Sequence, residues 1–347
     1  MARAVVRGDD EITIEVIDRD AAPSVESSAG ITVVRDLPDI DRQARGLAWA
    51  PSRVGTYLQR SRIRSRHWTS GAFDLFHVHY LNRYTDAVAR LPHPLVLSVH
   101  DAVPHVPRLG PRVEHRLLHR LYSRPDSIVV HHRRVAEELE ARFEVPPDRV
   151  HVVPYPVLTQ LSEPTRPPPG PPTVLLFGAL RPNKGLDVLD EAMRSLTDVE
   201  IRVVIAGRGH EELEQRALAM QDRDARIVAE IGYVTLERKT ELFHEASIVA
   251  LPYSSFSSQS AVLHDAYGYG RPVVVSDVGA LGETVRADGT GLVVPPAEPG
   301  ALAEAITRLL HQATWARFHD ACLEVAAERS PEAFGRQLRM VYERVLP

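Results

Sequence analysis

The sequence predicts an α/β protein with two doubly wound domains that face a cleft, and three observations support this prediction. Short runs rich in valine and isoleucine alternate with longer amphipathic stretches along the 347 residues, a pattern typical of repeated βα units around a parallel sheet. A proline-rich segment divides the chain near its middle. The length fits two domains of about 150 residues each. Ligands of such domains bind beyond the carboxyl ends of the strands.

Strands are expected wherever a short apolar run is bounded by glycine, proline or a polar cluster. In the first half these runs are residues 12–17, 31–34, 74–79, 95–100, 127–130 and 150–154. In the second half they are residues 173–178, 201–207, 227–232, 247–252, 272–277 and 291–295. Helix-like stretches separate nearly all of the second set. We therefore expect a first domain over residues 1–155 and a second over 173–330. The prolines of residues 156–172 forbid a helix and predict a stiff linker.

Composition narrows the class of protein. The chain has 41 basic and 46 acidic side chains, a net charge of −5, and 44% hydrophobic residues. These are values of a globular protein, and the acidic balance argues against nucleic-acid binding through overall charge. The one cysteine, Cys322, excludes a disulfide framework or a cysteine-built zinc site within the chain. No run approaches the roughly 20 apolar residues of a membrane span, and the first residues lack a secretory signal. We expect a cytoplasmic location.

The basic residues are strongly biased toward arginine: removing Lys184 and Lys239 from the 41 leaves 39 arginines. A lysine that persists against this bias indicates a chemical requirement. Two stretches are especially basic, and their arginines are Arg60, Arg62, Arg64 and Arg66, then Arg108, Arg112, Arg116, Arg120 and Arg124. A helix over the second stretch would carry a positive stripe. Two readings stay open: a solvated helix face, or peripheral contact with an anionic membrane.

A first candidate site lies in residues 177–185, FGALRPNKG, which leave a predicted strand and enter a predicted helix. Backbone amides at the helix start, together with Arg181 and Lys184, would bind an anion such as phosphate. The alternative is that both cations are ordinary surface residues.

A second candidate site lies in residues 254–279, where serines and Gln259 precede a predicted helix. Ser258 or Ser260 could cap that helix and leave other amides to a ligand. Asp265, about one turn further, could accept hydrogen bonds from ligand hydroxyls. The alternative is ordinary capping with a solvent-facing aspartate.

Histidines gather at strand ends in the first half. His77 and His79 are two residues apart, so on a strand they face the same side, and His100 ends the next strand. The pair could chelate a metal or supply hydrogen bonds to a cleft. A satisfied structural histidine is the alternative for each.

The motifs FGALRPNKG (177–185), IGYV (231–234), SSQSAVLHDAYGYGRPVVVSDVG (257–279) and GTGLVVPP (289–296) resemble, in order, the carboxyl half of GT-B glycosyltransferases of family 4. The first half is similar through DLFHVHYL (74–81) and LVLSVHDAVPH (95–105). The resemblance implies two Rossmann-like domains: the first binds the acceptor and the second binds a nucleotide sugar. It also implies that a last helix, within residues 331–347, crosses back to the first domain.

The resemblance implies roles for individual residues. Lys184 matches the lysine that contacts the donor diphosphate, and Arg181 stands in for an arginine that the family places where this chain has Ala179. His100 matches a histidine near the transferred sugar. Of the family's two donor-contacting glutamates, the ribose-contacting one is replaced by Asp265 and the sugar-contacting one by Ser257. Glycines and loop residues complete the expected donor site: Gly178, Gly232, Ser258, Gln259 and Ser260.

The activity implied is transfer of a sugar, with retention and without a metal or other cofactor, from a nucleotide-sugar donor to a glycan, lipid-linked or small-molecule acceptor. Alternatives are a non-catalytic GT-B protein or a GT-B enzyme of the sugar-nucleotide epimerase type, which the altered residue 257 favours. A histidine-based metallohydrolase is the weakest alternative, because that function would give the second half of the chain no role.

The amino terminus departs from the family, whose first domain opens with a strand, a glycine-bearing loop and a helix. Residues 2–10 resemble the end of that helix, which implies that the first strand and loop, roughly 20–35 residues, are absent. The alternative is that residues 4–6 pair as a short strand joined to residues 12–17 by a turn.

Overall fold

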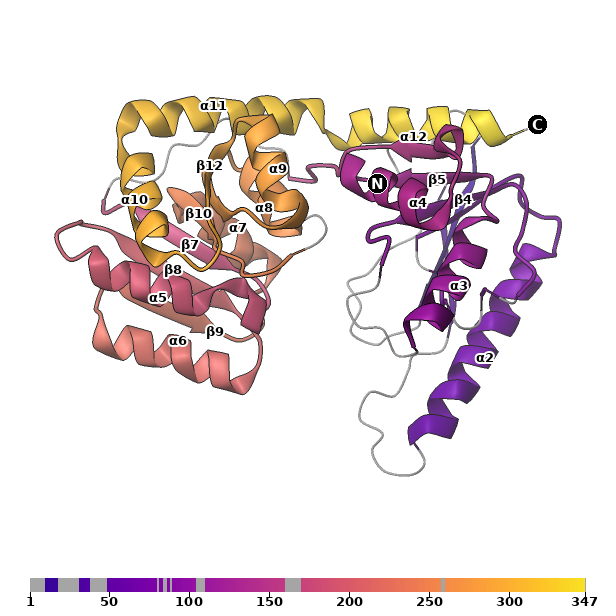
Figure 1. The fold of residues 1–347 in the computed structure, drawn as a ribbon, viewed down its shortest axis with the longest axis horizontal. Coiled ribbons are helices and arrows are strands. Elements are labelled where there is room, and N and C mark those ends of the chain that lie inside the picture. Colours follow the sequence, from indigo (N-terminus) through magenta and orange to yellow (C-terminus); the bar gives the residue numbers. More distant parts are fainter. Residues whose placement is uncertain are drawn as a thin grey trace. The chain divides into compact units, whose positions relative to one another are not determined.

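The computed structural model describes residues 10–17, 31–37, 49–79, 81–83, 86–87, 89–103, 110–159, 170–256 and 260–346. The chain divides into two compact units (Figure 1), one formed by Met1–Pro154 with Glu332–Pro347 and the other by Tyr155–Pro331. All twelve predicted strands are present among the described residues. No helix in these ranges is long and apolar enough to cross a membrane.

The second unit is a six-stranded parallel sheet with the order β12-β11-β10-β7-β8-β9. Its strands are β7 (Thr173–Phe177), β8 (Arg202–Gly207), β9 (Ile227–Ile231), β10 (Ile248–Leu251), β11 (Val273–Ser276) and β12 (Gly291–Val294). From β7 the chain adds strands in one direction through β9, and then in the other direction from β10. The point between β7 and β10 is therefore the topological switch point, where α/β sheets bind ligands.

Helices cover both faces of this sheet because its inner strands are apolar on both sides. They are α5 (Leu186–Ser195), α6 (Glu211–Arg223), α7 (Leu236–Glu245), α8 (Ala261–Gly268), α9 (Gly279–Asp288), α10 (Pro299–Leu310) and α11 (Gln312–Glu328). Along β7, Val174 and Leu176 pack with α5, α6 and α10, whereas Leu175 packs with α7, α8, α9 and α11. Successive residues of a strand point to opposite faces of the sheet, so each face of this sheet has its own hydrophobic core.

The first unit contains a four-stranded parallel sheet, β3-β4-β5-β6. Its elements are α2 (Trp49–Trp68), β3 (Phe76–Val78), β4 (Leu95–Val99), α3 (Pro111–Tyr122), β5 (Ser127–Val130), α4 (Arg133–Phe143), η1 (Pro147–Arg149), β6 (Val150–Val152) and α12 (Pro331–Val345). Leu97 and Ile128 pack toward α3 and α4, while Val96 and Val129 pack against α12. The last helix therefore contributes to the core of the first unit.

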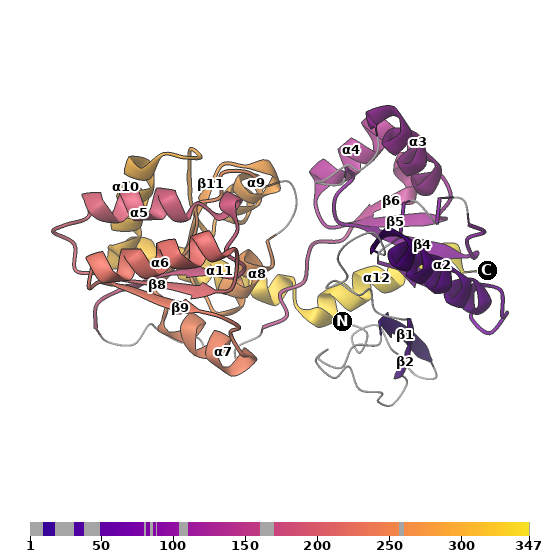
Figure 2. The ribbon, with the colours of Figure 1, turned by 90° about the horizontal axis from the view of Figure 1, so that it is seen from below.

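The remaining described strands of this unit, β1 (Ile12–Ile17) and β2 (Ile31–Leu37), pair in parallel as a separate two-stranded sheet (Figure 2). Arg339 of α12 forms an ion pair with Asp10, just before β1. Residues 1–9 lie outside the described residues. Both the expectation of an absent first strand and its alternative concern these residues, so both stay predictions.

The expected linker over residues 156–172 is partly wrong, because its start packs as part of the second unit. Val157 is fully buried, and its backbone N–H donates to the Arg329 carbonyl at 2.8 Å. An apolar residue within a proline-rich stretch is enough to dock the backbone when a complementary core lies beside it. Residues 160–169 are outside the described ranges.

The expected arginine stripe is also corrected in part. Arg120 Nε donates to the Ala87 carbonyl at 2.7 Å, and Arg124 donates to the Asp86 carbonyl at 3.0 Å. In the other basic stretch, Arg64 pairs with the buried Asp86 at 2.8 Å. These arginines hold the segment around residues 86–89, whereas Arg112 and Arg116 are exposed on α3. Arg108 is not among the described residues.

Candidate functional site

The turn after β7 approaches the end of β10 closely enough to bring their residues together. Gly178 follows β7 with φ 110°, and a Cβ there would lie 3.5 Å from Val262 of α8. Gly185 precedes α5 with φ 71°, and a Cβ there would lie 1.8 Å from the Pro252 carbonyl oxygen. Only glycine fits this contact and this backbone conformation. The predicted Gly178 and the neighbouring Gly185 therefore lie at the switch point between β7 and β10.

Lys184 ends the short 3-10 helix η2 (Pro182–Lys184) in this turn. Its Nζ lies 3.8 Å from the ring centroid of Tyr253 and 5.6 Å from that of Phe256, both from the segment after β10. Burial, and secondarily the charge of Arg181, lower the pKa of Lys184 to about 8. The predicted cations, Lys184 and exposed Arg181, are thus brought together as a site of positive potential.

At the start of α8, the structure tests only the Ser260 half of the expectation that Ser258 or Ser260 caps the helix. Ser260 occupies the N-cap position, yet its side chain makes no capping hydrogen bond. Its buried hydroxyl instead lies 3.4 Å from the Tyr253 hydroxyl. Because Tyr253 also faces Lys184, this contact links the start of α8 to the cationic turn. Ser258 and Gln259, together with Ser257, fall outside the described residues.

Asp265 lies in the second turn of α8 and forms an ion pair with Lys239 of α7. Lys239 Nζ is 2.7 Å from Asp265 Oδ1, and 17% of the Asp265 side chain is exposed. Burial raises the pKa of Asp265, while the hydrogen bond and charge of Lys239 oppose that rise. The alternative of a solvent-facing aspartate is wrong, because this carboxylate is mostly buried and paired.

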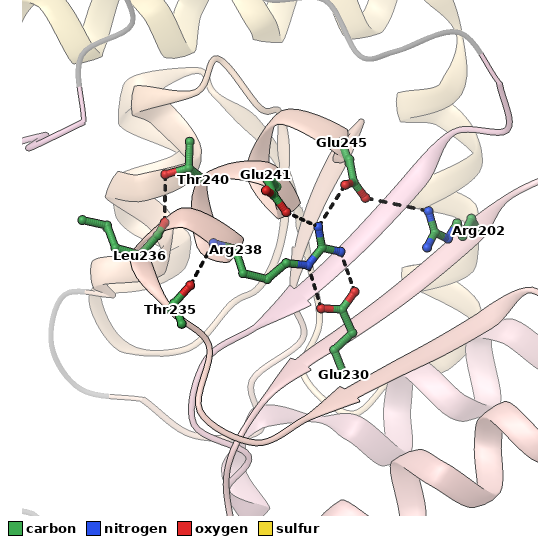
Figure 3. Close-up of polar contacts among 8 residues, drawn as sticks. All are labelled: Arg202, Glu230, Thr235, Leu236, Arg238, Thr240, Glu241 and Glu245. Atoms are coloured by element: carbon green, nitrogen blue, oxygen red, sulfur yellow. Dashed lines mark hydrogen bonds and ion pairs between the residues drawn. The ribbon is translucent and has the colours of Figure 1, made fainter.

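The helix that supplies Lys239 is fixed by a separate network around its neighbour Arg238 (Figure 3). Arg238 donates to both oxygens of Glu230 on β9, at 2.9 and 2.6 Å, and also to Glu241 and Glu245. Thr235 caps the helix through the Arg238 backbone N–H. These bonds hold the first turn of α7 against β9. Lys239 therefore extends toward α8 from a fixed backbone.

Gly232 follows β9 with φ 136°, and its N–H donates to the Gly207 carbonyl at 3.0 Å. The next residue, Tyr233, is 86% exposed. Gly232 therefore lies at the carboxyl edge of the same sheet as Gly178.

In the first unit, histidines cluster at the carboxyl edge of the sheet. His77 contacts the Tyr342 hydroxyl through Nδ1 at 2.6 Å and the Ser98 hydroxyl through Nε2 at 2.8 Å. Its ring stacks on that of His79 at 4.4 Å, and the rings of His100 and His131 lie 5.1 Å apart. Both nitrogens of His77 are bonded to hydroxyl groups of the protein itself, so His77 matches the alternative of a satisfied structural histidine.

These imidazoles resist protonation. Burial lowers the pKa of His77 well below its ordinary range, lowers that of His100, and lowers that of His131 to about 4. Neighbouring histidines add to the effect on His77 and His131 because a second positive charge nearby is unfavourable. Near neutral pH the cluster is uncharged. Within the described ranges, no group of three or more His, Cys, Asp or Glu is arranged to hold a metal ion.

Comparison with known proteins agrees with this architecture. The family described as Glycosyltransferase Family 4 matches residues 2–161, and the family described as Glycosyl transferases group 1 matches residues 171–312. The chain is 29% identical over 273 residues to a D-inositol 3-phosphate glycosyltransferase of Xylanimonas cellulosilytica. That match covers 70% of this chain and 65% of the relative, so somewhat less than two thirds of the relative is represented.

Solved structures show the same fold at low sequence identity. Sucrose-phosphate synthase of Thermosynechococcus elongatus is similar with a TM-score of 0.72 and 19% identity, over 96% of this chain and 88% of that one. The HepE protein of Anabaena, solved with UDP-glucose, is similar with a TM-score of 0.67 and 15% identity, over 96% and 100% of the two chains.

The two units and the cationic switch-point site define a protein of the GT-B class, built from two Rossmann-like domains. The two family matches lie mainly on one unit each, and together they take in most of the sequence. The chain belongs to the glycosyltransferases of family 4.

Sequence reasoning missed three residues that complete these groups. Lys239 could have been found from its rarity, which marked Lys184 equally well. His131 directly follows β5, so the reasoning that singled out His100 applied to it too. Tyr342 gave no sequence signal, because only the packing of α12 on the first unit brings it to His77.

Proposed function

We propose that this chain transfers a sugar from a nucleotide-sugar donor to a hydroxyl group of an acceptor. The observation that carries the proposal is the pair of cations Lys184 and Arg181 at the switch point, beside a helix whose carboxylate, Asp265, suits ribose hydroxyls. The cations suit a diphosphate. The HepE structure with UDP-glucose supports a nucleotide sugar as the donor.

In the proposed reaction the acceptor oxygen bonds to the anomeric carbon as the bond from that carbon to the β-phosphate oxygen breaks. The electron pair leaves with the nucleoside diphosphate, and the proton of the acceptor hydroxyl passes to an oxygen of that leaving diphosphate. Lys184 and Arg181 would stabilise the negative charge that develops on the leaving diphosphate. Because these side chains supply positive charge at that position, we propose a transfer that needs no metal. The family resemblance supports retention of configuration.

The histidines of the first unit support the assignment of the acceptor to that unit. A neutral imidazole such as that of His100 can donate and accept hydrogen bonds, which suits a hydroxyl-rich acceptor. His100, half-buried at the end of β4, is the member proposed to lie near the transferred sugar. The similarity to the D-inositol 3-phosphate glycosyltransferase of Xylanimonas favours a small phosphorylated polyol among glycan, lipid-linked and small-molecule acceptors.

The first test is a thermal-shift panel of nucleoside diphosphates and their sugars. A ligand at 100 times its dissociation constant should stabilise the protein by about 2.7 kcal/mol. Incubation of the bound donor with candidate acceptors, followed by NMR of the anomeric proton of the product, tests transfer and retention. Equal rates with and without a chelator test metal independence. Failure of every nucleoside diphosphate to bind would contradict the proposed function.

The serine at position 257, where the family has a glutamate, favours a second candidate. This is a GT-B protein that binds a nucleotide sugar without transferring it, or that epimerises it. Donor binding with no glycosylated product from any acceptor, or release of an epimerised sugar, would favour this candidate over transfer.

A further inference from the structure

Both lysines of this chain contact the proposed donor site. Lys184 lies at the cationic turn after β7, and Lys239 pairs with Asp265 on α8. The other 39 basic residues are arginines. A lysine at each of these two positions, against such a bias, points to a property that arginine lacks.

That property is visible in how cations of this chain bind carboxylates. Arg286 donates to both oxygens of Asp277, at 2.9 and 2.6 Å, and Arg329 likewise donates to both oxygens of Asp288. A guanidinium group favours this two-point contact. Lys239 Nζ lies 2.7 Å from Oδ1 of Asp265. An ammonium group is a compact point charge, so it can pair with one carboxylate oxygen and leave the second oxygen to other donors.

We propose that Lys239 is a positioning residue that holds Oδ1 of Asp265 and leaves Oδ2 to accept hydrogen bonds from the ribose hydroxyls of the donor. The inference rests on the proposed function. It assigns ribose recognition to a pair of side chains from two helices, and it explains why a lysine is present where the composition favours arginine.

Burial makes the partner necessary. Only 17% of the Asp265 side chain and 23% of the Lys239 side chain are exposed. Because burial disfavours the ionised carboxyl group, removing the cation would favour a protonated or reoriented side chain. Either change weakens acceptance of two hydroxyl groups, since an ionised carboxylate is the stronger acceptor.

A second contact keeps the two helices together when Lys239 is replaced. The Tyr269 hydroxyl, directly after α8, donates to Thr240 Oγ1 of α7 at 3.2 Å. The Arg238 network separately fixes α7 to β9. We therefore expect Lys239→Met to fold, with its defect confined to the carboxylate.

The experiment measures binding of UDP and GDP, each beside its 2′,3′-dideoxy form, by calorimetry. Lys239→Met should weaken binding of the ribose-bearing nucleotide on the order of 10-fold or more, the effect of a hydrogen bond to a charged group. Binding of the dideoxy form should stay within about twofold. Asp265→Asn should show the same selective loss. Lys239→Arg should restore thermal stability but not the preference for ribose, because a guanidinium takes both oxygens.

Arg286→Met is the matched control, since it removes the cation from Asp277 in the same unit and should leave both affinities unchanged. Equal losses for the ribose and dideoxy forms, parental binding in Lys239→Met, or full ribose preference in Lys239→Arg would each overturn the inference. If the parent binds no nucleoside diphosphate at all, the proposed function fails, and the inference fails with it. If the parent binds the nucleotides and Lys239→Met binds them equally well, only the inference about Lys239 fails, and the proposed function stands.

Discussion

The carboxyl edges of the two larger sheets carry opposite chemistry on similar backbones. In the first unit, His77, His100 and His131 lie in or directly after β3, β4 and β5, and burial keeps them uncharged. In the second unit, Lys184 and Lys239 lie after β7 and β9, and both lysines are near aromatic rings. Parallel strands deliver residues to one edge in both cases. What differs is the charge delivered there.

This difference indicates how a two-unit enzyme divides its ligands. Uncharged imidazoles can form hydrogen bonds with hydroxyl groups, whereas a lysine and an arginine at one turn attract a diphosphate. Each unit therefore suits one half of the proposed transfer reaction, and substitutions in the two units should have separable effects.

The largest expected effect is that of Lys184→Ala on transfer. Loss of one electrostatic group that acts on a leaving group costs about 3–4 kcal/mol of barrier, or roughly 100- to 1,000-fold in kcat. Initial rates at saturating donor measure it. Because Lys184 is half-buried at a turn, the melting temperature should change little.

Arg308→Ala, an exposed cation of α10, is the control and should keep parental rates. A transfer rate of Lys184→Ala within threefold of the parent would show that Lys184 does not act on the leaving diphosphate. Lys184 would then be an ordinary surface residue.

The next effect is acid destabilisation of the first unit. The pKa of His131 is about 4 in the folded protein, against 6.5 for an ordinary histidine. Between these values the unfolded chain binds a proton that the folded chain does not, so stability falls as pH falls from 6.5 toward 4. His131 alone accounts for about 3 kcal/mol across that window. Melting temperatures from pH 7.5 to 5 measure the loss.

His131→Gln should flatten that dependence, because glutamine can donate to the Val153 carbonyl, which His131 Nδ1 contacts at 2.9 Å, without titrating. His311→Gln, at an exposed histidine of the second unit, should leave the slope unchanged. An identical slope in all three proteins would show that the cluster is not the source of acid sensitivity.

A smaller effect is expected from the titration of Lys184 itself. Its pKa of about 8 means that Lys184 loses its positive charge in the free protein as pH rises through 8, while Arg181 stays charged. Nucleoside diphosphate affinity should therefore fall by about tenfold between pH 7 and 9, with proton uptake on binding. Calorimetry in buffers of different ionisation enthalpy measures both.

Lys184→Arg should move this loss above pH 9, since guanidinium stays protonated there. A flat affinity from pH 7 to 9 in the parent would mean that Lys184 does not contact the diphosphate.

The smallest expected effect concerns the outer surfaces. We propose that Arg112 and Arg116 on α3 contact an anionic membrane. By contrast, the first turn of α6 in the second unit carries negative charge, from Glu211, Glu212 and Glu214. The double variant Arg112→Glu, Arg116→Glu should reduce sedimentation with anionic liposomes, by about 1 kcal/mol per residue, and added salt should mimic it. Arg120 is left intact because its bond to Ala87 is structural.

Reversal of Arg133 and Arg142 on α4 is the control, since each pairs with a glutamate of its own helix. If the parent protein does not sediment with the liposomes, the exposed arginines of α3 are a solvated face.

The sequence determined the strands and the places where chemistry is delivered. Local apolar runs fixed β1 to β12, because a buried parallel strand needs a continuous apolar segment and leaves a clear signal. The positions of His100, Lys184 and Asp265 followed from strand ends and motif spacing.

Tertiary structure decided which side chains meet. The pairing of Lys239 with Asp265 joins two helices, the Tyr342 contact with His77 spans 265 residues, and Ser260 turns to Tyr253 instead of capping its helix. It also decided that Arg120 and Arg124 bind backbone carbonyls. Sequence patterns report periodicity and local propensity, whereas pairing, burial and the resulting pKa shifts depend on neighbours that only packing supplies.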